Sequence, residues 1–101
     1  MAFILQVDFP MDGPFGDDLS HSFAELANSI NEEPGMVWKI WTENAEAKEA
    51  GGIYLFQTKE DAVAYLEMHT ARLNSFGTKN IRGKIFAINE ALTKINNGPV
   101  T

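Results

Sequence analysis

The chain has 101 residues, which is enough for one folded domain, and its 45% hydrophobic and 22% charged residues are typical of a globular protein. It has no cysteine, which excludes disulfides and thiolate metal sites. Its 14 acidic and 8 basic residues give a net charge of -6, which argues against a partner that is nucleic acid or an anionic membrane.

The N-terminal segment predicts a strand and carries no targeting signal. Met1 to Asp8 lacks the basic region and the long apolar region of a signal peptide, and no apolar run approaches the ~20 residues that cross a bilayer. We therefore expect a cytoplasmic protein without a membrane segment. Apolar residues alternate from Phe3 to Phe9, which predicts the first strand, and Pro10 to Gly16 predicts a loop.

A first helix is expected to begin near Asp17 or Asp18, because an acidic side chain there can cap free N–H groups and meet the positive end of the helix dipole. Pro34-Gly35 follows the end of this helix. Its apolar residues are spaced four, three and four apart, so they share one face: Leu19, Phe23, Leu26 and Ile30.

The middle of the chain predicts a β-hairpin. Met36 to Glu43 is rich in Trp, Val and Ile and predicts the second strand. Asn44 to Ala50 is polar and too short for an independent helix, so it is interpreted as the hairpin loop. Gly51-Gly52 then leads into the third strand, Ile53 to Gln57.

A second helix follows a capping pattern in which Thr58 is the N-cap and Asp61 reaches back. Gly77 is expected to end the helix, Ile81 to Ile88 predicts the fourth strand, and Asn89 can cap a short last helix. The apolar stripe expected on the second helix consists of Ala62, Leu66, His69, Leu73 and Phe76.

The predicted fold is α+β, with ferredoxin-like βαββαβ order plus a short C-terminal helix, in a single domain over residues 1–101. Alternation places Met36, Trp38 and Ile40 on one face of the second strand, and Val37 and Trp41 on the other. Because both faces of the sheet carry large apolar groups, the face without helices needs a cover. We expect a second copy of the chain to supply it, as a homodimer.

Several segments resemble the YdhR-type family of the dimeric α+β barrel superfamily. They occur in the same order and cover nearly the whole chain: Gly13-Pro14-Phe15-Gly16-Asp17, Glu33-Pro34-Gly35, Trp38 to Glu43, Ala50 to Phe56, His69 to Leu73, Asn89 to Leu92, and Ile95-Asn96.

This resemblance implies a dimeric α+β barrel and a monooxygenase activity. The family is described as monooxygenases by its similarity to small enzymes that oxidise polycyclic aromatic quinols with dioxygen and without metal, flavin or haem. Their pocket lies between sheet and helices, and their catalytic pattern uses an Asn, a Trp and a Tyr. This chain offers Trp38, Trp41 and Tyr54, but its first two predicted strands contain no Asn.

His69 and Tyr54 are the candidate catalytic residues. His69 lies on the apolar stripe of the second helix, where a neutral imidazole could deprotonate a phenol or quinol. It could equally be a core histidine bonded to a backbone carbonyl. We expect its pKa to lie below the ordinary value, in a cavity walled by Trp38 or Trp41 and by Tyr54 or Phe56. The Tyr54 hydroxyl could orient a substrate oxygen or lie at the dimer interface.

Five residues are candidate substrate contacts. Trp38 and Trp41 could stack on a flat aromatic ligand, but they lie three apart on a strand and so face opposite sides, with one in the pocket and the other at the interface. Phe56 could wall the same cavity. Arg72 could bind a substrate oxyanion or form a surface ion pair. Glu43 could orient His69 or bind Arg72, or be a solvated strand-end carboxylate.

Three functions compete on this sequence. The first is a cofactor-independent monooxygenase acting on a small phenol- or quinol-like aromatic substrate. The second is a non-enzymatic dimer that binds a small apolar ligand, and the third is a haem-binding or haem-degrading protein with His69 as iron ligand. His21 and His69 are far apart and no cluster has the spacing of metal ligands, so no metal site is expected.

Overall fold

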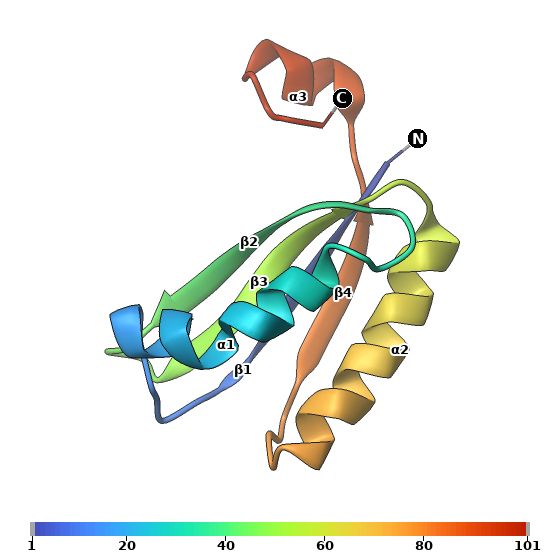
Figure 1. The fold of residues 1–101 in the computed structure, drawn as a ribbon. Coiled ribbons are helices and arrows are strands. Elements are labelled where there is room, and N and C mark those ends of the chain that lie inside the picture. Colours follow the sequence, from blue (N-terminus) through green and yellow to red (C-terminus); the bar gives the residue numbers. More distant parts are fainter. Residues whose placement is uncertain (1, 101) are drawn as a thin grey trace.

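The computed structural model describes residues 2–100 and contains strands and helices in the predicted order (Figure 1). The ferredoxin-like βαββαβ order with a short terminal helix is therefore confirmed. The elements are β1 (Phe3–Pro10), α1 (Gly16–Ile30), β2 (Met36–Asn44), β3 (Glu49–Phe56), α2 (Lys59–Ser75), β4 (Arg82–Ala87) and α3 (Glu90–Ile95).

The four strands form one antiparallel sheet in the order β2-β3-β1-β4. Both long helices cover the same face of this sheet, while α3 lies beyond its end (Figure 1). The alternation read from the sequence of β1 sets the inner face, since Leu5, Val7 and Phe9 are all buried under the helices. The core between sheet and helices consists mainly of these residues with Ile30, Ala50, Tyr54, Phe56, Ala62, Tyr65 and Leu73.

The start of α1 differs from the prediction. The helix begins at Gly16, so Asp17 and Asp18 lie in its first turn and do not cap it, and the N-cap residue Phe15 offers no side-chain acceptor. The Gly16 N–H instead donates to Glu43 Oε1 of β2 over 2.7 Å. A carboxylate from the neighbouring strand therefore supplies the acceptor at the positive end of the helix.

The caps of α2 and α3 follow the sequence closely. Thr58 accepts a hydrogen bond from the Asp61 N–H, and Asn89 accepts one from the Leu92 N–H, as predicted for N-cap residues. The predicted apolar stripe of α2 is partly wrong, because Phe76 lies at the C-cap with 63% of its surface exposed. Tyr65 is buried with Ala62, His69 and Leu73.

A β-bulge at Val37 changes the predicted faces of β2. Met36 pairs with Phe56 whereas Trp38 pairs with Leu55, so Val37 is the extra residue. The extra residue turns Met36 toward the helices and Trp38 away from them, and the prediction that Met36 and Trp38 share a face is therefore wrong. The hairpin loop is also shorter than predicted, since β3 already begins at Glu49.

The face of the sheet opposite the helices is apolar over much of its area. Pairing places Trp38 beside Leu55 and Ile40 beside Ile53, while Phe86 lies across from Ile4. Ile40 is 52% and Phe86 46% exposed. Within residues 2–100, no helix combines the length and the apolar character required to span a membrane.

Candidate active site

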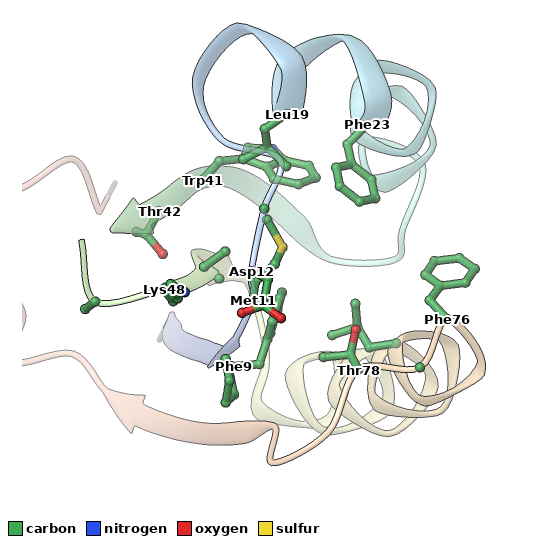
Figure 2. A pocket seen from close by; sticks show the side chains of 17 residues that line it. Phe9, Met11, Asp12, Leu19, Phe23, Trp41, Thr42, Lys48, Phe76 and Thr78 are labelled. Carbon is green, nitrogen blue, oxygen red and sulfur yellow. The ribbon is translucent and has the colours of Figure 1, made fainter. Parts of the chain in front are cut away.

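A cavity of about 600 Å³ opens between α1, the C-terminal end of α2 and the sheet (Figure 2). In Figure 2, Phe23 of α1 and Phe76 after α2 point toward one another across it, with Trp41 and Phe9 on its walls. Asp12 and Lys48 are the charged residues of the lining. The volume and the aromatic walls suit a small ring system.

Trp41 is the tryptophan on the helix side of the sheet. It pairs with Gly52, lines the cavity and stacks on Phe23 with 6.2 Å between ring centroids. Trp38 lies on the opposite face, where its indole Nε1 donates to the Pro99 carbonyl oxygen over 2.9 Å. The two indoles therefore lie on opposite faces of the sheet, as expected.

A partly buried polar cluster lies behind Trp41 and joins β3 to α2. The hydroxyls of Tyr54 and Tyr65 are 3.2 Å apart, with Tyr65 as donor. Arg72 Nη2 lies 3.4 Å from the Tyr65 hydroxyl and 2.9 Å from His69 Nδ1. Burial raises the pKa of both tyrosines, so both hydroxyls stay protonated.

The imidazole of His69 is only 4% exposed and lies beside a pair of tyrosine rings, with its centroid 5.1 Å from that of Tyr65 and 6.4 Å from that of Tyr54. An arginine can only donate, so Nδ1 accepts from Arg72 and Nε2 carries the proton. Burial, and then the nearby Lys39 and Arg72, lower the pKa of His69 to about 3. The ring is therefore neutral at pH 7, and its lone pair is already occupied.

Lys39 completes the cluster, although no pattern in the sequence selects it. Its Nζ lies 3.4 Å from the centroid of the Trp41 ring and 4.7 Å from that of Tyr54. Burial, and then Arg72, lower the pKa of Lys39 to about 7. At neutral pH this amine can therefore either accept or donate a proton.

A glycine makes room for the lysine stem. A methyl group placed on Gly52 would lie 2.6 Å from Lys39 Cε, so the absence of a side chain at this position lets Lys39 run across the sheet. The glycine at position 52 is therefore explained by the packing of Lys39, which the sequence of the strand did not indicate.

Two predicted contacts lie outside the cluster. Glu43 neither orients His69 nor binds Arg72, because its carboxylate accepts from Gly16 at the start of α1. Phe56 is fully buried and packs against Tyr54 and Tyr65, so it supports the cluster from below and does not line the cavity. His21 is exposed, as expected for a surface residue, and does not line the cavity.

The expected cavity beside His69 is only partly present. Trp41 lines it, and so does Leu73, one helical turn after His69, but His69, Tyr54 and Phe56 do not. Among residues 2–100, no three His, Asp or Glu side chains come together as metal ligands would.

The second strand does contain an asparagine, because β2 extends to Asn44. The Asn44 side chain accepts a hydrogen bond from the Ala47 N–H in the hairpin turn.

The sequence matches one protein family over nearly its whole length. Residues 4–99 match the family described as "Putative mono-oxygenase ydhR". No curated protein sequence matches the chain at a significant level.

Solved structures resemble the fold at low sequence identity. A mutant of SnoaB, a cofactor-independent oxygenase from Streptomyces nogalater, is 13% identical with a TM-score of 0.61, over 87% of this chain and 93% of that one. The monooxygenase from the gene ActVA-Orf6 of Streptomyces coelicolor, in complex with Nanaomycin D, is 18% identical with a TM-score of 0.60, over 87% and 88%. An antibiotic biosynthesis monooxygenase from Nitrosomonas europaea, described as putative, is 17% identical with a TM-score of 0.57, over 87% and 90%. At these identities the likeness shows the fold.

Proposed function

The chain belongs to the ydhR family, described as putative mono-oxygenases, and from this premise we propose that it oxidises a small phenol- or quinol-like aromatic substrate with dioxygen and without a bound cofactor. The observation that carries the proposal is the position of Trp41 between a cavity and a polar cluster. Trp41 lines the aromatic cavity of about 600 Å³, and the amine of Lys39, which belongs to the polar cluster, lies against its indole ring.

The chemistry balances without an external reductant. A phenol with a free ring C–H loses its proton, and the phenolate gives one electron to dioxygen. The resulting radical and superoxide combine to form a C–O bond, and the peroxide takes up the proton. Loss of the ring hydrogen and cleavage of the O–O bond then release water and leave a quinone. One phenol and one dioxygen thus become one quinone and one water.

In this proposal Lys39 accepts the phenol proton and returns it to the peroxide. Its pKa of about 7 suits a group that both accepts and donates near neutral pH. His69 is less suited to the role of base, because Arg72 occupies its lone pair and its pKa is about 3. We assign His69 instead to holding the Arg72 guanidinium, whose positive charge stabilises the phenolate.

Tyr54 and Trp41 orient the substrate in this proposal. Tyr54 is 1% exposed and lies behind the cavity wall, where its oxygen accepts from Tyr65. Its own O–H therefore donates only to a substrate oxygen that reaches past Trp41 to Lys39. Trp41 and Phe23 supply a stacked aromatic wall for the ring. The haem alternative gains no support, because the His69 ring is buried and its Nδ1 accepts from Arg72.

We also propose that the working form is a homodimer, as in a dimeric α+β barrel. The apolar face opposite the helices carries Trp38, Ile40, Ile53 and Phe86, and a second sheet packed against it would remove these side chains from water.

The test is oxygen uptake by chelator-treated protein with a panel of naphthols and hydroquinones. We expect uptake with at least one of them, and a loss of about 100-fold or more in kcat for Lys39→Met, as for removal of a general base. His21→Gln is the matched surface control and should retain the full rate. Absence of uptake above the buffer rate for every compound would contradict the proposal. Tight binding without uptake would identify a ligand-binding module instead.

A further inference from the structure

Two cations lie in the polar cluster without an acidic partner. Within residues 2–100, the ion pairs of the molecule are those of Arg82 with Asp8 and Glu49, at the far end of the sheet, and neither Lys39 nor Arg72 forms one. A charge partly removed from water without a counter-charge is costly, so a guanidinium and an amine that lie near one another without a carboxylate are suited to an anion that arrives from outside.

Arg72 retains donor capacity inside the protein. Its Nη2 group is used by His69 and Tyr65, whereas its Nε is buried and has no hydrogen-bond partner in the described part of the chain. Unpaired buried donors are rare in folded proteins and call for an explanation. Glu33 is the carboxylate whose charge reaches the cluster, where it raises the pKa of Tyr65, but it does not pair with Arg72 or Lys39.

The cluster meets the aromatic cavity at Trp41. Lys39 Nζ rests on the Trp41 ring, which is a wall of the cavity, and Leu73 lines the cavity from α2 one helical turn after His69, while Lys39 and Arg72 themselves lie behind this wall. A ring that stacks near Trp41 and Leu73 with a polar end turned toward Lys39 would reach the cluster at this wall. The apolar body and the charged end of one ligand would then meet matching surroundings.

We infer that Lys39 and Arg72 form an anion-binding subsite, and that the ligand is an aromatic anion whose charged oxygen is a phenolate or an aryl carboxylate. The inference rests on the proposed function in using the same cavity, but it concerns binding and requires no turnover. An arginine and a lysine with free donors are the usual partners of such oxygens.

Binding of an anion to this subsite has a proton signature. The groups that face Lys39 are Trp41 and Tyr54 on the sheet and Arg72 and His69 on α2, so no acidic side chain among residues 2–100 holds its charge when the site is empty. With a pKa of about 7, the amine is mostly neutral at pH 8. A ligand that is already ionised should restore the ammonium and so take up close to one proton from the buffer.

The experiment is calorimetric titration of the full chain at pH 8 in triethanolamine and in Tris, two buffers that are not anions and whose different heats of ionisation report proton uptake. The probes are 2-naphthoate, its neutral isostere 2-naphthamide, and 4-nitrophenol, whose phenolate absorbs visible light. We expect an anion to bind about 10- to 100-fold more tightly than the amide, as for hydrogen bonds to charged groups, and with proton uptake. Whether the carboxylate or the phenolate binds assigns the charged oxygen.

Variants separate charge from proton transfer. Lys39→Arg should keep the preference for an anion and lose the proton uptake, whereas Lys39→Met should lose both. Arg72→Met should weaken anion binding and keep the uptake, and Lys59→Met, on the exposed start of α2, is the surface control. Each variant is first checked for a native unfolding midpoint.

Equal affinity for the amide and both anions, or uptake that persists in a folded Lys39→Arg protein, would overturn the inference. Anion binding without oxygen consumption would leave the inference standing and contradict the monooxygenase proposal. Oxygen consumption without any preference for anions would do the reverse.

Discussion

At the scale of single residues, the site depends on one permanent cation, Arg72, beside two bases with lowered pKa values. Burial lowers the pKa of both Lys39 and His69 most strongly, and the positive charge of Arg72 lowers both further. The result is a neutral imidazole that accepts from a guanidinium and an amine that can gain or lose a proton near pH 7. The neutral state of His69 follows mainly from its burial, and the near-neutral pKa of Lys39 follows from burial and then from Arg72.

The buried imidazole should make stability depend on pH. His69 has an ordinary pKa of ~6.5 when unfolded and about 3 when folded. Between these two pH values the unfolded chain binds one proton more than the folded chain. The free energy of unfolding is therefore highest above pH ~6.5 and falls toward pH 3, by up to about 1.4 kcal/mol per pH unit. Denaturant midpoints from pH 7 to 4 measure this slope. His69→Gln should flatten it and His21→Gln should not, and equal slopes in all three proteins would refute the assignment.

Sequence reasoning identified three of the five residues of the polar cluster. His69 was found from its place on an apolar stripe and Arg72 from its spacing to His69, while Tyr54 came from the β3 pattern. Tyr65 was missed, although it lies on the turn of α2 directly before His69, because Leu66 gave an equally good apolar stripe. Lys39 was not selected, because a strand lysine is expected to point to solvent, and alternation places it on the face of Trp41 without showing that the helices cover this face.

At the scale of elements, β3 is the part of the sheet that the site depends on most. Its two glycines solve different problems. A methyl group on Gly51 would collide with the Val7 backbone carbonyl of β1. A methyl group on Gly52 would collide only with the flexible end of the Lys39 side chain. The first glycine permits strand pairing, and the second permits the lysine to cross the sheet.

Alanine substitutions should separate these two roles. Gly51→Ala is expected to destabilise the fold by about 1–3 kcal/mol or more, because backbone must move. Gly52→Ala should cost less stability, since a side chain can shift, but it should weaken binding of an aromatic anion by displacing Lys39. Denaturant unfolding and calorimetry on both variants give the two quantities. A Gly52→Ala protein with unaltered ligand affinity would show that Lys39 does not need this path.

The elements themselves were largely predictable, and their exceptions have local causes. Capping residues and apolar periodicity located α2 and α3, because those signals act within one helical turn. The start of α1 was misjudged because its acceptor, Glu43, comes from a strand 27 residues away. Long-range contacts of this kind have no periodic signature in the sequence.

At the scale of the whole molecule, the sheet has one face covered by helices and one face that is apolar and open. Trp38, Ile40 and Phe86 on the open face come from two strands at opposite edges of the sheet, and Ile53 lies between them, so they form a surface and not isolated exposed residues. The alternation in the sequence had already indicated two apolar faces. A single chain offers nothing among residues 2–100 that would cover all of the second one.

A homodimer should therefore form, and a charge on this face should dissociate it. Light scattering at micromolar concentration is expected to give twice the mass of one chain. Ile40→Lys should shift the protein toward the monomer, because a buried lysine would be unpaired at the interface. Val63→Lys, at a comparably apolar exposed position on α2, should remain dimeric. A wild-type protein with the mass of one chain would contradict the proposed assembly.

The central claim is that the protein inserts one oxygen atom of dioxygen into an aromatic ring without a cofactor. Chelator-treated protein is incubated with a naphthol under ¹⁸O-labelled dioxygen, and the quinone is reduced at once so that its oxygen cannot exchange with water. Mass spectrometry should find one labelled oxygen in the product, formed in proportion to the amount of protein. A naphthol recovered unchanged, or a product whose new oxygen is unlabelled, would contradict the account.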